Sequence, residues 1–192
     1  MPPKVTVTEA EILEAAFELV RCDGIEKLSA RAIAQALGCS TQPIYRCYGS
    51  MAGLHEAVFE RAAELAMGFL VGEQAEHPFL GMGLGNLRFA QEEPQLHRLI
   101  TRADRVVGDL VAGASPPPFV LQQMRSLPEL AVLDDAQLRR IHTLLWFFSQ
   151  GLATVFDAAT GDDPMPMARE YLTIAGQAVI EWELRQQRTE QP

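Results

Sequence analysis

Apolar residues recur along this chain at steps of three and four positions, the spacing that places them on one face of an α-helix. The first such run follows Thr8, which precedes Glu11 at the spacing of a capping box. Asp23 and Gly24 end the run. Its apolar face consists of Ile12, Leu13, Ala16, Phe17 and Val20. The pattern predicts an amphipathic helix from about residue 8 to residue 23.

Two short helices are predicted next, over about 29–37 and 40–47. Ser29 and Ser40 are the candidate N-caps, because a serine hydroxyl can accept from a free backbone N–H in the first turn. Gly38 separates the two helices, since glycine adopts the left-handed conformation at little cost. The apolar positions that turn toward one another are Ile33, Ala34, Leu37 and Ile44. Two short helices around a glycine turn are the layout of a helix-turn-helix.

The second helix of such a motif enters the major groove of DNA by its N-terminal end. In this chain that end, and the start of the helix before it, carry hydroxyl, amide, phenol and guanidinium groups. These groups suit base edges and phosphates. The candidate DNA-binding residues are Ser29, Arg31, Ser40, Thr41, Gln42, Tyr45 and Arg46.

Helical periodicity continues through the rest of the chain. Ser50 can cap a long helix to about residue 72, in which Gly53 and Gly68 are weak points. The further helices are expected over about 79–93, 94–104, 118–126, 134–158 and 166–187. The sequence therefore predicts an all-α protein of about nine helices. Its N-terminal helix-turn-helix domain spans 8–52, a connecting helix spans 50–72, and a larger helical domain spans 73–188.

The distribution of charged residues limits how many contacts the first domain can make with DNA. The 192-residue chain has a net charge of −9, yet residues 1–50 hold five basic and six acidic residues. Most of the negative charge thus lies in the second domain. Because the first domain has few basic residues, we expect few phosphate contacts and a dependence on dimerisation for DNA affinity.

Other features narrow the class of protein. No apolar run reaches the length of about 20 residues that spans a bilayer, and the N-terminus lacks the apolar core of a signal peptide. We therefore expect a soluble cytoplasmic protein without a membrane partner. Nothing in the sequence implies a cofactor, and neither a nucleophile elbow nor a phosphate loop is present, so an enzyme is not expected.

Residues 8 to about 72 resemble the DNA-binding domain of the TetR family of transcriptional regulators. The matching segments are ILEAAFELVRCDGIEKLSARAIAQALGCS and TQPIYRCYGSMAGL. The resemblance implies that Tyr45 and its neighbours contact phosphate, and that Thr41 and Gln42 reach base edges. Further along, RFAQEEPQLHRLI and WFFSQGLATV resemble one branch of the family's C-terminal domains. Such proteins are usually homodimeric repressors that a small molecule releases from operator DNA.

The chain departs from the family pattern at three positions. Cys47 and Tyr48 replace a common histidine and phenylalanine, and Met51 replaces a common lysine. Loss of that lysine removes a phosphate contact, although the helix N-terminus can still donate backbone N–H groups. These changes bear on DNA affinity more than on the fold.

The second domain is expected to hold an effector pocket and a dimer face. Aromatic, methionine and polar residues suggest the pocket lining, with ordinary core packing as the alternative for each. The candidate effector-binding residues are Phe89, Arg102, Phe119, Met124, His142 and Trp146. Two helices from each subunit would form a four-helix interface, with burial inside the monomer as the alternative. Its candidate residues are Phe148, Leu152, Val155, Ala175, Val179 and Trp182.

Alternatives remain for the cysteines, the histidines and the whole chain. Cys22, Cys39 and Cys47 could form a redox switch, but small apolar packing residues are the favoured interpretation. The four histidines lack ligand spacing, so no metal site is expected. A helical small-molecule-binding protein with weak or lost DNA binding is the alternative to a regulator, and a helical enzyme is a more distant one.

Overall fold

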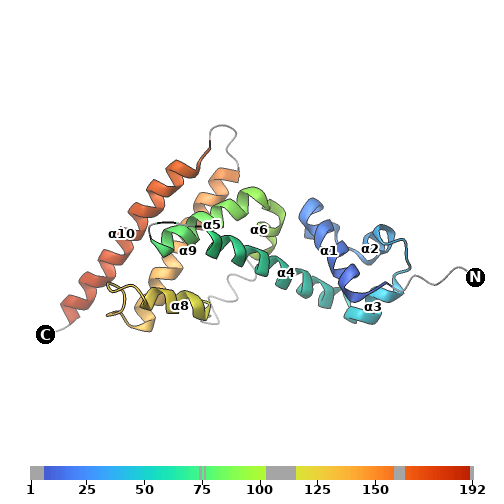
Figure 1. The fold of residues 1–192 in the computed structure, drawn as a ribbon, viewed down its shortest axis with the longest axis horizontal. Coiled ribbons are helices and arrows are strands. Elements are labelled where there is room, and N and C mark those ends of the chain that lie inside the picture. The colour runs from blue at the N-terminus through green and yellow to red at the C-terminus, as the bar shows by residue number, and fades with distance from the viewer. Residues whose placement is uncertain (1–6, 74, 76, 103–115, 158–162, 191–192) are drawn as a thin grey trace, which may run out of the picture. The chain divides into compact units, whose positions relative to one another are not determined.

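The computed structural model describes residues 7–73, 75, 77–102, 116–157 and 163–190, and all regular structure in these residues is helical (Figure 1). The all-α prediction is confirmed. The described helices are α1 Glu9–Asp23, η1 Ile25–Lys27 (a 3-10 turn), α2 Ala30–Ala36, α3 Gln42–Tyr48, α4 Met51–Gly72, α5 Pro78–Glu92, α6 Pro94–Ile100, α8 Pro118–Arg125, α9 Asp135–Asp157 and α10 Met165–Glu190. Part of the predicted helix 94–104 and of the loop 113–118 lies outside the described residues.

Side-chain caps fix the start of several helices, because the first N–H groups of a helix lack partners within it. The Thr8 hydroxyl accepts from the Glu11 N–H at 3.3 Å, and the Glu11 carboxylate accepts from the Thr8 N–H at 2.8 Å. That backbone hydrogen bond lowers the pKa of Glu11. The predicted capping box is confirmed. Ser50 likewise accepts from the Gly53 N–H at 3.2 Å.

The prediction that Ser40 caps the third helix is wrong. α3 begins at Gln42, Thr41 occupies the N-cap position, and no side chain caps this end. Pro43 lies in the first turn and has no N–H, so one of the donors that a cap would serve is missing. The hydroxyl of Ser40 is therefore not needed to hold the helix start.

The described residues form two compact units. The first comprises those of Met1–Met67 and Glu92–Arg105, and the second those of Gly68–Gln91 and Val106–Pro192. α6 therefore belongs with the N-terminal helices, where it packs against α1, although the sequence assigns it to the C-terminal domain. The boundary between the units falls within α4.

The first unit has a small core at the meeting point of α1 to α4. Its fully buried members come from all four helices, and they are Ile12, Val20, Ile33, Ile44, Leu54 and Val58. Leu28 is buried, whereas Ile25 in the 3-10 turn is only half-buried. This core holds α2 and α3 in place by their apolar sides and leaves their polar sides to solvent.

Two apolar clusters hold the second unit together. One joins α5, α9 and α10, and its members are Leu80, Leu84, Leu87, Ala90, Ala153, Phe156, Ala168 and Leu172. The other joins α8, the 126–134 loop and α9, and its members are Val120, Met124, Leu130, Leu133, Leu138 and Ile141. α9 contributes to both clusters and also packs against α10, so it is the central helix of this unit.

The glycines at the start of α5 allow close packing. A methyl group on Gly81 would lie 2.7 Å from the Glu73 carbonyl oxygen, and one on Gly83 would lie 3.0 Å from the Leu172 side chain. A methyl group on Gly85 would collide with the Phe69 carbonyl group. These residues reduce intrinsic helix propensity, but they let α5 approach the backbone of α4 directly.

Candidate functional site

The turn between α2 and α3 has the geometry of a helix-turn-helix. Ser29 caps α2, where its hydroxyl accepts from the Ala32 N–H at 3.2 Å. Gly38 follows with a φ of 62°, the left-handed conformation that favours glycine. Ile33 and Ile44 are fully buried beneath the turn. The apolar side of each helix is thereby fixed, and the orientation of the polar side follows from it.

The polar tip of α3, defined as Ser40, Thr41, Gln42, Tyr45 and Arg46, faces solvent. Thr41 is half-buried and the other four residues are exposed. The Tyr45 side chain is 48% exposed although it is aromatic. Both the ring and the hydroxyl of Tyr45 are therefore accessible from solvent. The polar tip is available to lie against a duplex.

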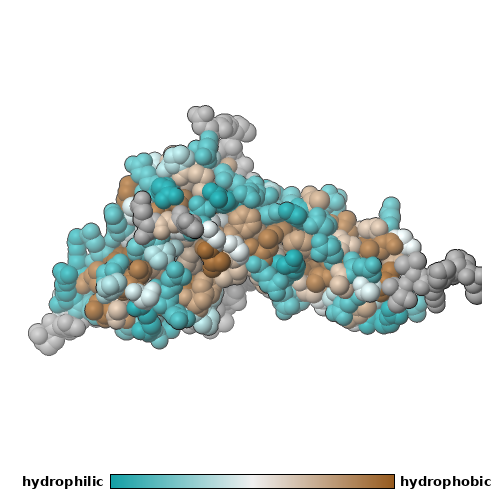
Figure 2. Space-filling view, in the orientation of Figure 1, coloured by the Kyte–Doolittle hydropathy of each residue, from teal (hydrophilic) through white to brown (hydrophobic). Residues whose placement is uncertain are grey.

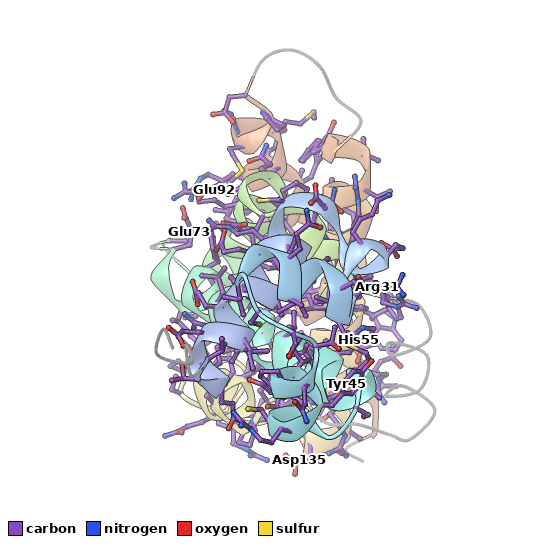
Figure 3. All side chains as sticks on the ribbon, turned by 90° about the vertical axis from the view of Figure 1, so that its right-hand side faces the viewer. Arg31, Tyr45, His55, Glu73, Glu92 and Asp135 are labelled. Carbon is purple, nitrogen blue, oxygen red and sulfur yellow. The ribbon has the colours of Figure 1, made fainter. Side chains whose placement is uncertain are left out.

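Two arginines that have no ion-pair partner among the described residues flank this surface. Arg31 on α2 and Arg46 on α3 are exposed, and neither forms an ion pair with another residue that the structure describes. In Figure 3, Arg31 and Tyr45 lie on the same side of the ribbon. Guanidinium groups in this arrangement can form bidentate hydrogen bonds with phosphate. All seven predicted DNA-binding residues lie in these two helices and the turn between them.

Sequence reasoning missed the residue that anchors the recognition helix. The Tyr48 hydroxyl donates to the Glu9 carbonyl oxygen at 3.0 Å and joins the end of α3 to the start of α1. Burial raises the pKa of Tyr48, and the nearby Glu9 raises it further, so the phenol remains a donor. One indication of this role is present in the sequence, because Tyr48 stands where the family pattern has phenylalanine, which lacks the hydroxyl that donates here.

The three cysteines are free. Cys39 and Cys47 are half-buried, and the Cys39 thiol donates to the Ser40 carbonyl oxygen at 3.2 Å. Cys22 differs from the expected packing role, because it lies on the exposed side of α1. No three cysteine, histidine, aspartate or glutamate residues among those described are placed to hold a metal ion.

The second unit contains a cavity of about 550 Å³, a volume suited to a small organic molecule. The end of α4, residues 77–86, the loop before α9, α9 and α10 supply its walls. Its apolar lining includes Leu70, Phe79, Leu80, Met82, Leu145, Trp146, Leu172 and Ile180. Its polar lining includes His77, Asn86, Glu129, His142, Ser149, Thr173, Gln177 and Glu181.

The structure brings two of the six predicted effector-binding residues together in this cavity, His142 and Trp146. Phe89 is fully buried against Phe69, with ring centroids 5.3 Å apart. Met124 is fully buried in the α8–α9 cluster, and Phe119 packs against that cluster. These three are core residues, the alternative given for each of them. Arg102 is exposed and belongs to the first unit.

Apolar side chains also reach the surface of α9 and α10. Their exposed members recur at helical spacing, and we name them the apolar stripe: Leu144, Phe147, Phe148, Val155, Met167, Tyr171, Ile174 and Trp182. Figure 2 shows hydrophobic surface in brown along α10. Of the six predicted dimer-face residues, three belong to the stripe. Leu152, Ala175 and Val179 are half-buried within the unit instead.

The described residues contain no helix with the length and apolar character needed to cross a membrane.

Residues 12–58 match the family described as "Bacterial regulatory proteins, tetR family". No curated protein matches the chain. Among solved structures, the multidrug binding protein EbrR complexed with imidazole is similar, with a TM-score of 0.54 and 19% identity over 86% of this chain and 88% of that one. A TetR-like transcriptional regulator from Rhodococcus sp. RHA1 is similar over 98% of both chains, with a TM-score of 0.53 and 17% identity.

A third solved structure, a putative TetR-family transcriptional regulator from Rhodococcus sp., has a TM-score of 0.50 and 18% identity over 89% of this chain and 97% of that one. At these identities the structural likeness establishes the fold. The sequence match covers α2, the turn and α3. Residues 12–58 thus match the N-terminal domain of the tetR family of bacterial regulatory proteins, and the resemblance found in this segment of the sequence is confirmed.

Proposed function

We propose that this protein is a cytoplasmic, homodimeric repressor that binds operator DNA through α2 and α3 and is released by a small molecule. The observation that carries the proposal is the exposed polar tip of α3. Its amide, hydroxyl, phenol and guanidinium groups can pair with base edges and phosphates. Arg31 and Arg46, which have no ion-pair partner among the described residues, supply cationic contacts.

The roles within this surface follow from its chemistry. Gln42 lies at the start of α3, the end that a recognition helix inserts into the major groove, and its side-chain amide can form two hydrogen bonds with adenine. Tyr45 and Arg46 lie one turn further along and suit the phosphate backbone. Ser29 and Arg31, at the start of α2, suit the backbone on the other side of the groove.

The apolar stripe supports the dimer. Exposed apolar residues are normally scattered, whereas a row of them at helical spacing on each of two packed helices indicates an interaction surface. A second copy of the chain presents the same row, so α9 and α10 from two subunits can form a four-helix interface. Twofold symmetry then directs two copies of α3 to successive major grooves of a near-palindromic site.

The cavity supports release by a small molecule. A ligand changes DNA affinity only if it binds the DNA-bound and free conformations unequally. The cavity is lined by α9 and α10, and the proposed dimer face lies on the same two helices. Occupation of the cavity can therefore alter the pairing of subunits, and with it the separation of the two recognition helices.

DNA binding is tested by fluorescence anisotropy with the DNA upstream of the protein's own gene. Gln42→Ala and Tyr45→Ala should each weaken binding about tenfold, because Gln42 loses a base contact worth about 1–3 kcal/mol and Tyr45 loses a hydrogen bond to a charged phosphate worth about 1.5–3 kcal/mol. Gln186→Ala, an exposed glutamine on α10, is the matched control and should bind normally. Arg46→Ala should also reduce the slope of log affinity against log salt by about 1, as expected for one lost phosphate contact.

Equal binding by the parent protein, Gln42→Ala and Tyr45→Ala would contradict the assignment of α3 as the reading element. Absence of salt-dependent DNA binding by the parent protein would favour the alternative, a small-molecule-binding protein that has lost DNA affinity. The net charge of −9 and Met51, which replaces a common lysine, are the features consistent with that alternative.

A further inference from the structure

The charged groups that line the cavity are all carboxylates. Among the residues that the structure describes, the ionisable members of the lining are His77, Glu129, His142 and Glu181, and no described lysine or arginine belongs to it. Burial lowers the pKa of His142, so this ring is neutral at neutral pH. A neutral imidazole offers one hydrogen-bond donor and one acceptor but no positive charge. The cavity therefore has no permanent cation to bind an acidic ligand.

The carboxylate of Glu129 is held beside His77. The Nδ1 atom of His77 accepts from the Phe79 N–H at 3.3 Å, and this assigns the proton of a neutral ring to Nε2. Nε2 lies 3.6 Å from an oxygen of Glu129, whose side chain is 44% exposed. The carboxylate of Glu129 therefore lies at the cavity wall near His77 without a direct hydrogen bond to it, and its oxygens can accept from a ligand.

Glu181 on α10 pairs with Arg185, one turn further along the same helix, at 2.9 Å. Both side chains are mainly exposed, at 63% for Glu181 and 75% for Arg185. An exposed pair of this kind contributes little free energy and exchanges readily. Glu181 can therefore turn from Arg185 to a cation inside the cavity at small cost.

The apolar wall of the cavity suits an aromatic body. Trp146 lines it and packs edge-on against Phe147, with ring centroids 5.2 Å apart. The indole face is the strongest cation–π acceptor among protein side chains. Phe79, Leu145 and Ile180 provide further apolar contact area in the same cavity.

We infer that the cavity binds an aromatic or otherwise apolar molecule that carries a positive charge, such as a protonated amine, and that it discriminates against carboxylates. The apolar lining contacts the body of the ligand. Its cationic end is bound by the carboxylates of Glu129 and Glu181 and by the face of the Trp146 ring. This inference rests on the proposed function, in which the same cavity is the effector site. It deepens that proposal by naming the chemical class of the effector.

Three probes with one aromatic body and different charge test the inference: 1-naphthylmethylamine, 1-naphthalenemethanol and 1-naphthoate. Their affinities for the full-length protein are measured by isothermal titration calorimetry at pH 7.5. The amine should bind at least tenfold more tightly than the naphthoate and more tightly than the alcohol. Glu129→Gln and Glu181→Gln should each reduce the preference for the amine over the alcohol several-fold. Glu170→Gln, an exposed glutamate of α10 outside the cavity, is the matched control and should preserve it.

Equal or tighter binding of the naphthoate would overturn the inference, and so would failure of the amine to bind. An amine preference that survives in both glutamine variants would also overturn the assigned roles of the carboxylates. DNA binding is measured on the same preparation. If DNA binds and the amine does not, the ligand class is wrong while the regulator stands. If the amine preference is found without DNA binding, the ligand class stands and the regulator proposal fails.

Discussion

Arg21 on α1 forms two hydrogen bonds with the carboxylate of Glu93, the residue at the N-cap of α6. Its Nε donates to one oxygen at 2.7 Å and a terminal nitrogen donates to the other. The Glu93 side chain is only 8% exposed, whereas the Arg21 side chain is 44% exposed. Pairing with Glu93 raises the pKa of the Arg21 guanidinium. Arg21 and Glu93 are 72 residues apart in the sequence, and their pairing joins α6 to the first helix of the first unit.

Arg21→Ala should lower the free energy of unfolding by about 2 kcal/mol, because it leaves a buried carboxylate without its charge partner. The loss is smaller than for a fully buried pair, because solvent screens the exposed arginine. Arg125→Ala is the matched control. It also removes an arginine from a carboxylate, but Arg125 and Asp135 are both about half-exposed, and the expected loss is below about 1 kcal/mol. Urea unfolding followed by circular dichroism measures both.

Equal losses for the two arginine variants would show that burial of Glu93 does not determine the strength of its pair. The comparison also has a functional readout. If α6 supports the geometry of α1 to α3, Arg21→Ala should weaken DNA binding several-fold at a temperature where it remains folded, and Arg125→Ala should not.

Tyr48→Phe should lower the free energy of unfolding by about 1 kcal/mol, the value of one hydrogen bond, and weaken DNA binding a few-fold. The reason is that the hydroxyl holds the end of α3 to the Glu9 carbonyl of α1. Tyr171→Phe is the control, since Tyr171 is 45% exposed on α10 and its hydroxyl has no hydrogen bond to a described residue. Normal DNA binding by Tyr48→Phe would limit this hydrogen bond to a structural role.

Helix boundaries could be predicted from the sequence wherever a local cap decides them. Thr8, Ser29, Ser50 and Asp134 each accept from an N–H in the first turn that follows, and each lies within three residues of its partner. Such contacts depend on neighbours in sequence alone. The start of α3 was predicted two residues early, because the cap expected at Ser40 does not form.

The cavity lining could not be predicted in the same way. Met124 and His142 are equally plausible on an amphipathic pattern, yet Met124 is fully buried in a cluster while His142 lines the cavity. Which side of a helix faces a void is decided by the packing of helices distant in sequence. The same holds for Glu183, which is completely buried because Arg140 on α9 donates to both its oxygens, at 2.6 and 2.8 Å. Periodicity cannot identify such pairs.

Two glycine substitutions should have opposite effects on stability. In Gly85→Ala the new methyl group collides with the backbone of Phe69, so α4 and α5 must separate, at a cost of about 2–3 kcal/mol in the free energy of unfolding. In Gly68→Ala nothing lies within 4 Å of the new methyl group. Alanine has the higher helix propensity, and a gain of about 1 kcal/mol is expected. Thermal unfolding should place the two variants on opposite sides of the parent protein, and a stabilised Gly85→Ala would show that the two helices are not in close contact.

The last prediction concerns acid sensitivity. Burial lowers the pKa of His142 below its ordinary value, while in the unfolded chain the ring titrates near a pKa of about 6.5. Between these two values the unfolded state binds more protons, so stability rises with pH in this window. The stabilisation from the neutral ring is complete above the unfolded pKa and is lost as pH falls through the folded pKa. The cavity also contains His77, Glu129 and Glu181, so a variant is needed to isolate the effect.

His142→Gln removes the titrating ring and keeps a polar side chain at the cavity wall. Urea unfolding at several pH values between 8 and 5 should show a weaker loss of stability on acidification for this variant than for the parent protein. His55→Gln is the control, because His55 lies on α4 in the first unit and is not a lining residue of this cavity. It removes a different histidine and should leave the contribution of His142 intact. Identical pH profiles for the parent protein and His142→Gln would mean that His142 is not kept neutral by burial, and the cavity would then gain a positive charge in mild acid.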